Sequence, residues 1–140
     1  MRYKINCQPL FLAPVLVAVI LLPHTMLGSA ATPKALVGKW AGRVSSASSA
    51  SFVVTIEIGA DSKAHIVGEG SPCFAEADLV LTTTGPESVT LAGSSKSHEN
   101  VTFKGTLDGN EKQIEVTYIV NGSGSARCET DRGAGTLEKQ

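Results

Sequence analysis

Two histidines, His65 and His98, are the side chains best suited to acid–base or metal chemistry beyond residue 30 of this 140-residue chain. His65 lies between Ala64 and Ile66, so it faces outward if they face inward on a strand. His98 lies in a Ser-rich turn beside Glu99. A metal site needs a third or fourth ligand, which this spacing does not supply. We therefore expect both histidines to be surface residues, and we predict neither a metal site nor a cofactor.

Two pairs of carboxylates could also do chemistry. Glu76 and Asp78 lie two residues apart, and so do Glu129 and Asp131. On a strand either pair would share a face, as the two carboxylates of a glycosidase do, but we expect both pairs to be solvated at a rim. The serines lie mostly in turn-forming segments, and the chain has no G-x-S-x-G nucleophile motif. We predict that the protein is not an enzyme.

The start of the chain is typical of an export signal. Arg2 and Lys4 precede an apolar run from Leu10 to Leu22, which is shorter than the ~20 residues of a membrane-spanning helix. Small residues follow, and we place the cleavage after Ala30, with Ala31 as the second choice. An uncleaved membrane anchor is the alternative.

Cleavage there separates a signal peptide, residues 1–30, from a single domain, residues 31–140, which is long enough for one core. That domain holds ten Lys and Arg residues against thirteen Asp and Glu residues. Its basic residues are scattered singly, which argues against nucleic-acid binding. We expect an exported protein, periplasmic or extracellular, that meets the membrane only through the transient signal peptide.

Three cysteines occur, and Cys7 would leave with the signal peptide. The remaining pair, Cys73 and Cys128, is predicted to form a disulfide, as an even pair does in an oxidising compartment. A two-thiol metal site is the alternative, but it lacks the short spacing that such sites use.

Apolar and polar residues alternate along most of the chain beyond residue 36. Phe52, Val54 and Ile56 fall on one face of a segment whose other face carries Thr55 and Glu57. This period of two is typical of a half-buried strand, and the short Gly-, Ser- and Asp-containing segments between such runs are typical of hairpin loops. We predict eight strands, near residues 37–45, 51–58, 62–69, 77–83, 87–92, 99–107, 112–120 and 132–138.

Eight consecutive strands with short connections most simply form an antiparallel up-and-down meander. Closing the meander into a barrel removes exposed strand edges. A two-sheet β-sandwich is the alternative, and the neighbour-to-neighbour hairpins favour the barrel. The predicted fold class is all-β, a small eight-stranded barrel.

The one tryptophan lies between glycines in Gly38-x-Trp40-x-Gly42, at the opening of the first predicted strand. A lone large aromatic flanked by glycines is suited to plugging a barrel end. A G-x-W at this place resembles the opening of lipocalins and related calycin barrels. The resemblance implies that Trp40 closes the barrel floor and stacks with an arginine near the last strand. Arg132 is the better-placed candidate and Arg127 the other.

The wider pattern is similar to small exported bacterial domains of unknown function, which implies a compact antiparallel barrel with bridged cysteines and no particular activity. The chain departs from true lipocalins in its shorter length and in lacking their middle-loop signature and the helix after the barrel. The motifs that carry the resemblance are Gly38-x-Trp40-x-Gly42, Gly70-Ser71-Pro72-Cys73, Phe103-x-Gly105-x-Leu107 and Cys128-x-x-Asp131-x-Gly133-x-Gly135-x-Leu137.

Three non-catalytic functions remain open. The first is a binding module that holds a small apolar molecule in the barrel, although a barrel of this size can also be filled by side chains. The second is an inhibitor or interaction domain that recognises an exported protein through its loops. The third is a structural envelope protein. The predicted inward-facing set contains no charge and consists of Phe52, Val54, Ile56, Ile66, Leu79, Leu81, Val89, Leu91, Val101, Phe103, Ile114, Val116, Tyr118 and Leu137.

Overall fold

The computed structural model describes residues 31–83, 85–122 and 128–140, and within them the regular elements are eight β-strands. No helix in these ranges is long and apolar enough to cross a membrane. The strands are β1 (Gly38–Val44), β2 (Phe52–Ile58), β3 (Lys63–Glu69), β4 (Glu76–Thr83), β5 (Ser88–Ser95), β6 (Asn100–Leu107), β7 (Gln113–Asn121) and β8 (Thr130–Lys139).

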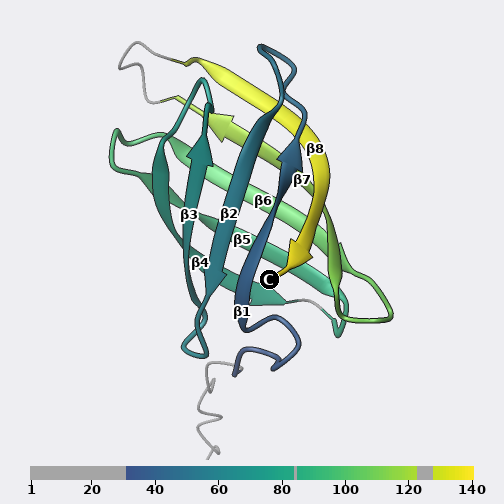
Figure 1. Cartoon of the computed structure of the whole chain (residues 1–140). Helices are drawn as coiled ribbons and strands as arrows, with labels where there is room; N and C mark the ends of the chain where they lie inside the picture. Colours follow the sequence, from purple (N-terminus) through teal and green to yellow (C-terminus); the bar gives the residue numbers. More distant parts are fainter. Residues whose placement is uncertain (1–30, 84, 123–127) are drawn as a thin grey trace, which may run out of the picture.

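Each strand pairs antiparallel with the next, and β8 returns to pair with β1, so the sheet is a closed barrel (Figure 1). The predicted meander and its closure into a barrel are confirmed. The closing seam runs from Trp40 opposite Lys139 to Val44 opposite Gly135. Closure pairs both edges of the sheet, which leaves no open edge to recruit another chain.

The two ends of the barrel differ in what covers them (Figure 1). We call the end that carries the loops after β1, β3, β5 and β7 the disulfide end. We call the opposite end, which carries the loops after β2, β4 and β6 and the segment 31–37, the Trp40 end. The site residues described below lie at these ends, at the closing seam or on the outer face of β2, β3 and β4.

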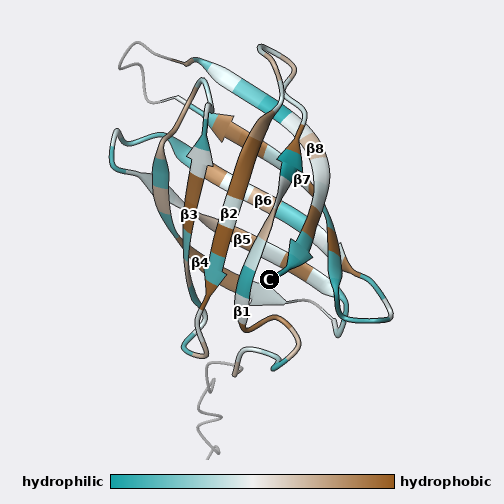
Figure 2. Ribbon diagram, in the orientation of Figure 1, coloured by the Kyte–Doolittle hydropathy of each residue, from teal (hydrophilic) through white to brown (hydrophobic). Residues whose placement is uncertain are grey.

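The alternation along the strands places one apolar face inside the barrel, and Figure 2 shows the hydrophobic residues concentrated along the strands. Every residue of the predicted inward-facing set is buried, and the most exposed of them, Leu81, is 6% exposed. Complete burial of a side chain such as Val54 or Ile66 contributes about 1.5–3 kcal/mol. These residues form one continuous hydrophobic core that also includes Trp40, Leu36 and Phe74.

Three strands are longer than predicted: β4 begins one residue earlier, at Glu76, and β5 and β8 are extended further. β5 continues to Ser95 and β8 begins at Thr130, because backbone pairing with neighbouring strands extends through residues of low strand propensity. Ser95 pairs with Ala77, and Thr130 pairs with Asn121. Tertiary pairing outweighs local propensity at these strand ends.

Candidate functional site

The Trp40 end is covered by the segment that precedes β1. Trp40 is fully buried, and its indole Nε1 donates a hydrogen bond of 2.9 Å to the carbonyl oxygen of Leu36, which is also fully buried. The Leu36 N–H in turn bonds the carbonyl oxygen of Pro33 at 2.9 Å. The Thr32 hydroxyl lies 2.8 Å from the Ser62 hydroxyl in the loop after β2. The segment therefore caps this opening of the barrel.

The backbone requires the two glycines beside Trp40. Gly38 has a φ of 130°, a conformation that residues with a side chain rarely adopt. A Cβ on Gly42 would lie 2.0 Å from the carbonyl oxygen of Thr136 on β8. Gly42 thus permits the close approach of β1 and β8 at the closing seam.

The cation over the Trp40 ring is Lys139. The prediction that Arg132 stacks on Trp40 is wrong. Lys139 Nζ lies 5.2 Å from the ring centroid and donates a hydrogen bond of 2.7 Å to the carbonyl oxygen of Ala35. Arg132 pairs with Ile119, and at ~3.3 Å per residue it lies roughly 23 Å along β8 from Lys139. The physical reason is the register, which sets Trp40 opposite Lys139. Arg127, the other candidate, lies outside the described residues.

At the disulfide end, Cys73 in the loop after β3 is paired with Cys128 in the loop after β7. Their Cα atoms lie 5.1 Å apart, and 55 residues separate them in sequence. In the loop-closure model a cross-link over that separation stabilises the fold by about 4 kcal/mol. The next residue, Phe74, packs edge-on against Phe52 and Phe103, with ring centroids 6.1 and 6.5 Å away. The bridge therefore ties the loop after β3 to Cys128, just before β8, beside the aromatic part of the core.

Asp131 is a buried carboxylate at the same end, with 1% of its surface exposed. It accepts hydrogen bonds from the Tyr118 hydroxyl at 2.6 Å, from the Ser48 hydroxyl at 2.9 Å and from the Ser46 hydroxyl at 2.9 and 3.0 Å. The Ser48 N–H lies 3.3 Å from the same carboxylate. Asp131 thus joins the loop after β1 to the inner faces of β7 and β8.

The expectation of a solvated pair at Glu129 and Asp131 is therefore wrong for Asp131. Glu129 is exposed and precedes β8, whereas Asp131 pairs with Val120 inside the barrel. The alternation that places Leu137 inside also places Asp131 inside, since the two are six residues apart. The alternation along β8 could therefore have predicted that Asp131 is buried.

The Asp131 contacts shift two pKa values. Burial raises the pKa of the Tyr118 hydroxyl, and its hydrogen bond to Asp131 raises it further. Burial would also raise the pKa of Asp131, but the hydrogen bonds from Tyr118, Ser48 and Ser46 stabilise the ionised carboxylate and hold its pKa below the usual value. Asp131 is therefore an ionised carboxylate held by hydroxyl donors.

The loop after β5 is fixed by a second buried carboxylate. Glu99 is 3% exposed, accepts a hydrogen bond from the Ser95 hydroxyl, and donates its own N–H to that hydroxyl at 3.1 Å. His98 is exposed, has a φ of 69°, and donates its N–H to the Ser95 carbonyl oxygen at 3.0 Å. The alternation that turns Val101 and Phe103 inward also places Glu99 on the inner face, so this phase could have predicted its burial.

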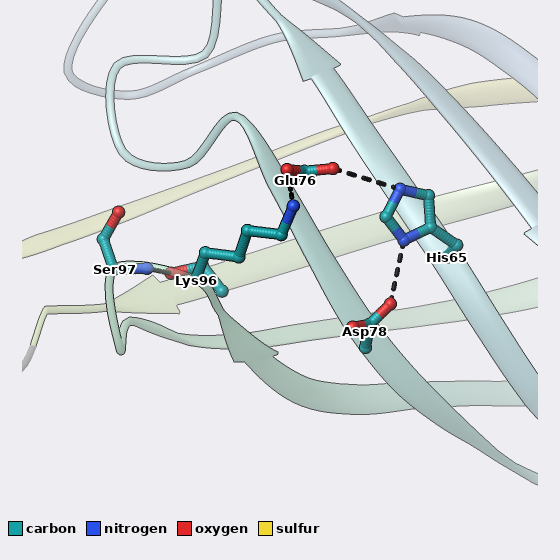
Figure 3. A network of polar contacts seen from close by, with 6 residues as sticks. His65, Glu76, Asp78, Lys96 and Ser97 are labelled. Atoms are coloured by element: carbon teal, nitrogen blue, oxygen red, sulfur yellow. Dashed lines mark hydrogen bonds and ion pairs between the residues drawn. The ribbon is translucent and has the colours of Figure 1, made fainter.

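A polar network on the outer face of the barrel centres on His65 (Figure 3). His65 Nδ1 lies 2.8 Å from Asp78 Oδ1, and His65 Nε2 lies 3.4 Å from Glu76 Oε2. Lys96, in the loop after β5, forms an ion pair with Glu76. The hydrogen bond that Lys96 donates to Glu76 within this ion pair lowers the pKa of Glu76 and raises the pKa of Lys96. We call these four residues the His65 network.

The network brings together one predicted histidine and one predicted carboxylate pair. Glu76 and Asp78 share the outer face of β4, and Asp78 pairs directly with His65 on β3. His98 is not among its contacts. Each ring nitrogen of His65 faces a different carboxylate, and in the part of the chain that the structure describes no three His, Cys, Asp or Glu residues are placed to hold a metal ion. The contacts of the His65 network hold the side chains of Glu76, Asp78 and Lys96 in place on the barrel surface.

In comparisons with known proteins, the sequence matches no family model and no curated protein. The likeness to lipocalins is therefore one of architecture, a small eight-stranded antiparallel barrel compatible with a lipocalin-like fold.

Proposed function

We propose that the protein is an exported, non-catalytic binding module that recognises a protein partner through its outer surface and the loops of its disulfide end. The observation that carries this proposal is the packing of the barrel interior. Tyr118 stacks on Phe103 with ring centroids 5.4 Å apart and contacts Phe52 edge-on at 5.6 Å. Trp40 occupies the other end of the same core. Because side chains occupy the interior and cover both ends, recognition falls to the outside.

The fixed loops of the disulfide end support the same proposal. The loop after β1 is held by Asp131, the loop after β3 by the bridge from Cys73 to Cys128, and the loop after β5 by Glu99. Loops fixed before binding lose less conformational entropy when a partner binds. Loops on a rigid scaffold are also the usual place for recognition.

Export is supported by the apolar run of residues 10–22 and by the disulfide, which is consistent with an oxidising compartment. The predicted signal peptide, residues 1–30, lies outside the described residues. Whether the protein is periplasmic or extracellular does not alter the proposed mode of recognition.

Capture of a partner by the immobilised protein tests this function. We expect one stoichiometric partner from the exported fraction of the source cells, and we expect Ala50→Arg in the exposed loop after β1 to reduce its capture at least tenfold. Gly109→Arg is the matched control, because Gly109 is exposed in the loop after β6 at the Trp40 end and an added Cβ would meet nothing within 4 Å. Absence of a stoichiometric partner, or equal loss with both variants, would contradict the proposal.

A further inference from the structure

A groove of about 500 Å³ lies on the outer face of β2, β3 and β4. Val80, which is 58% exposed, is the apolar side chain that faces into the groove, while Ala64 and Leu79 line it only from the strands, because both are buried in the core. Val80 and Ile119 are the exposed large apolar side chains of the described residues, and of the two Val80 lines this groove. The groove therefore offers the exposed side chain of Val80 to a partner.

Two carboxylates flank His65 in this groove, and Val80 lies two residues along β4 from one of them, Asp78. Glu57 on β2 and Asp78 on β4 both pair with His65 on β3, so they flank it at roughly 5 Å per strand. The hydrogen bond from His65 Nδ1 to Asp78 Oδ1, 2.8 Å long, orients the Asp78 carboxylate (Figure 3). A lysine, Lys63, also lines the groove, and its ammonium is 3.7 Å from Asp61. A cation on a partner would thus meet two carboxylates, while the groove's own lysine already has an anionic neighbour.

We infer that this groove binds an arginine or lysine side chain of the partner protein. A long cationic side chain buries its aliphatic stem on apolar surface while its charged head stays at the edge. Here the stem would lie on Val80 and the head would reach the carboxylates of Glu57 and Asp78. His65 acts as a positioning residue, because it orients Asp78.

The groove continues into the surface already proposed for recognition. His65 and Asp78 belong both to the groove and to the His65 network, whose other members are Glu76 and Lys96. Lys96 lies in the loop after β5, at the disulfide end. The inference rests on the proposed function and extends its interface along β3 and β4.

A peptide titration tests the groove without the partner. The probe is the capped pentapeptide Ala-Leu-Arg-Leu-Ala, and the control probe replaces its arginine with citrulline, which keeps the shape and removes the charge. In amide NMR spectra of the ¹⁵N-labelled exported protein we expect shifts in Lys63, His65 and Val80, with a Kd of about 1 mM. We expect the citrulline peptide to bind at least fivefold more weakly.

Surface variants locate the site. Asp78→Asn, Glu57→Gln and Val80→Thr are each expected to weaken the arginine peptide at least threefold. Glu115→Gln and Ile119→Thr remove an exposed carboxylate and an exposed apolar side chain from β7 and are expected to leave the Kd unchanged. All five side chains face solvent, so the amide spectrum of each variant should retain the wild-type fold.

Three results would overturn the inference: equal binding of the two peptides, shifts confined to other strands, or no binding at 10-fold the expected Kd. If Ala50→Arg abolishes partner capture while Asp78→Asn and Glu57→Gln leave it unchanged, the groove is not part of the interface and the proposed function stands. Loss of capture with both carboxylate variants, together with the peptide result, supports the groove as the basic-residue site.

Discussion

Replacing Trp40 with alanine is expected to lower the free energy of unfolding by about 3–5 kcal/mol, the usual cost of truncating a buried tryptophan. Trp40 is fully buried and belongs to the continuous core. Its removal also leaves the Leu36 carbonyl oxygen without its indole donor and Lys139 without its ring contact. The cap over the Trp40 end would lose its hydrogen bond to β1 and keep the one from Lys139 on β8 to the Ala35 carbonyl oxygen. Urea unfolding followed by circular dichroism measures the loss, because the variant has no tryptophan fluorescence.

Two controls separate the cap from general effects of substitution. Trp40→Phe keeps an aromatic ring and loses the indole hydrogen bond, so we expect a loss of about 1–2 kcal/mol. Ile119→Ala removes a side chain that is 47% exposed, and we expect a change within about 0.5 kcal/mol. A Trp40→Ala variant as stable as Ile119→Ala would contradict the assignment of Trp40 as the plug of this end.

Replacing Asp131 with asparagine is expected to destabilise the protein by about 2–3 kcal/mol at neutral pH. The carboxylate accepts hydrogen bonds from Tyr118, Ser46 and Ser48, and an amide of the same size offers one acceptor oxygen in place of two. Urea unfolding at pH 7 measures the difference. Glu129→Gln removes the same charge from an exposed position two residues away and should change stability by less than about 0.5 kcal/mol.

The effect of Asp131→Asn should depend on pH in a defined direction. The pKa of Asp131 is lowered in the folded protein, whereas an unfolded aspartate titrates near ~3.9. The ionised carboxylate therefore stabilises the fold above about pH 4, and this contribution is lost as the pH falls through the lowered folded pKa. The stability gap between wild type and variant should shrink below about pH 4. A gap that is absent at pH 7, or unchanged in acid, would show that Asp131 does not hold the loop after β1.

The strands could be predicted because their information is local. The alternation of Phe52, Val54 and Ile56 with Thr55 and Glu57 identifies a strand and its inner face. Gly- and Asp-containing turns separate the strands, and their short lengths favour neighbour-to-neighbour pairing and hence the meander. The Cys73–Cys128 pair was predictable for a different reason, since two cysteines allow one bridge.

The contacts at the barrel ends could not be predicted in the same way. The partner of Trp40 depends on the register of the β1–β8 seam, which joins the two ends of the sheet and puts Lys139 where Arg132 was expected. The alternation of β8 places Asp131 inside, but its partner Ser46 lies 85 residues away in sequence, and no local pattern connects the two. The His65 network likewise combines β3, β4 and the loop after β5. Each of these sites depends on side chains that only the closed barrel brings together.

The central claim is that the barrel is filled by its own side chains and acts through its outside. A native mass spectrum of the protein from the exported fraction, repeated after denaturation, tests this claim most directly. We predict the same mass in both spectra, equal to residues 31–140 less the two hydrogens of the disulfide. A heavier native species that loses its excess mass on denaturation would reveal a molecule held by the barrel and would contradict the claim.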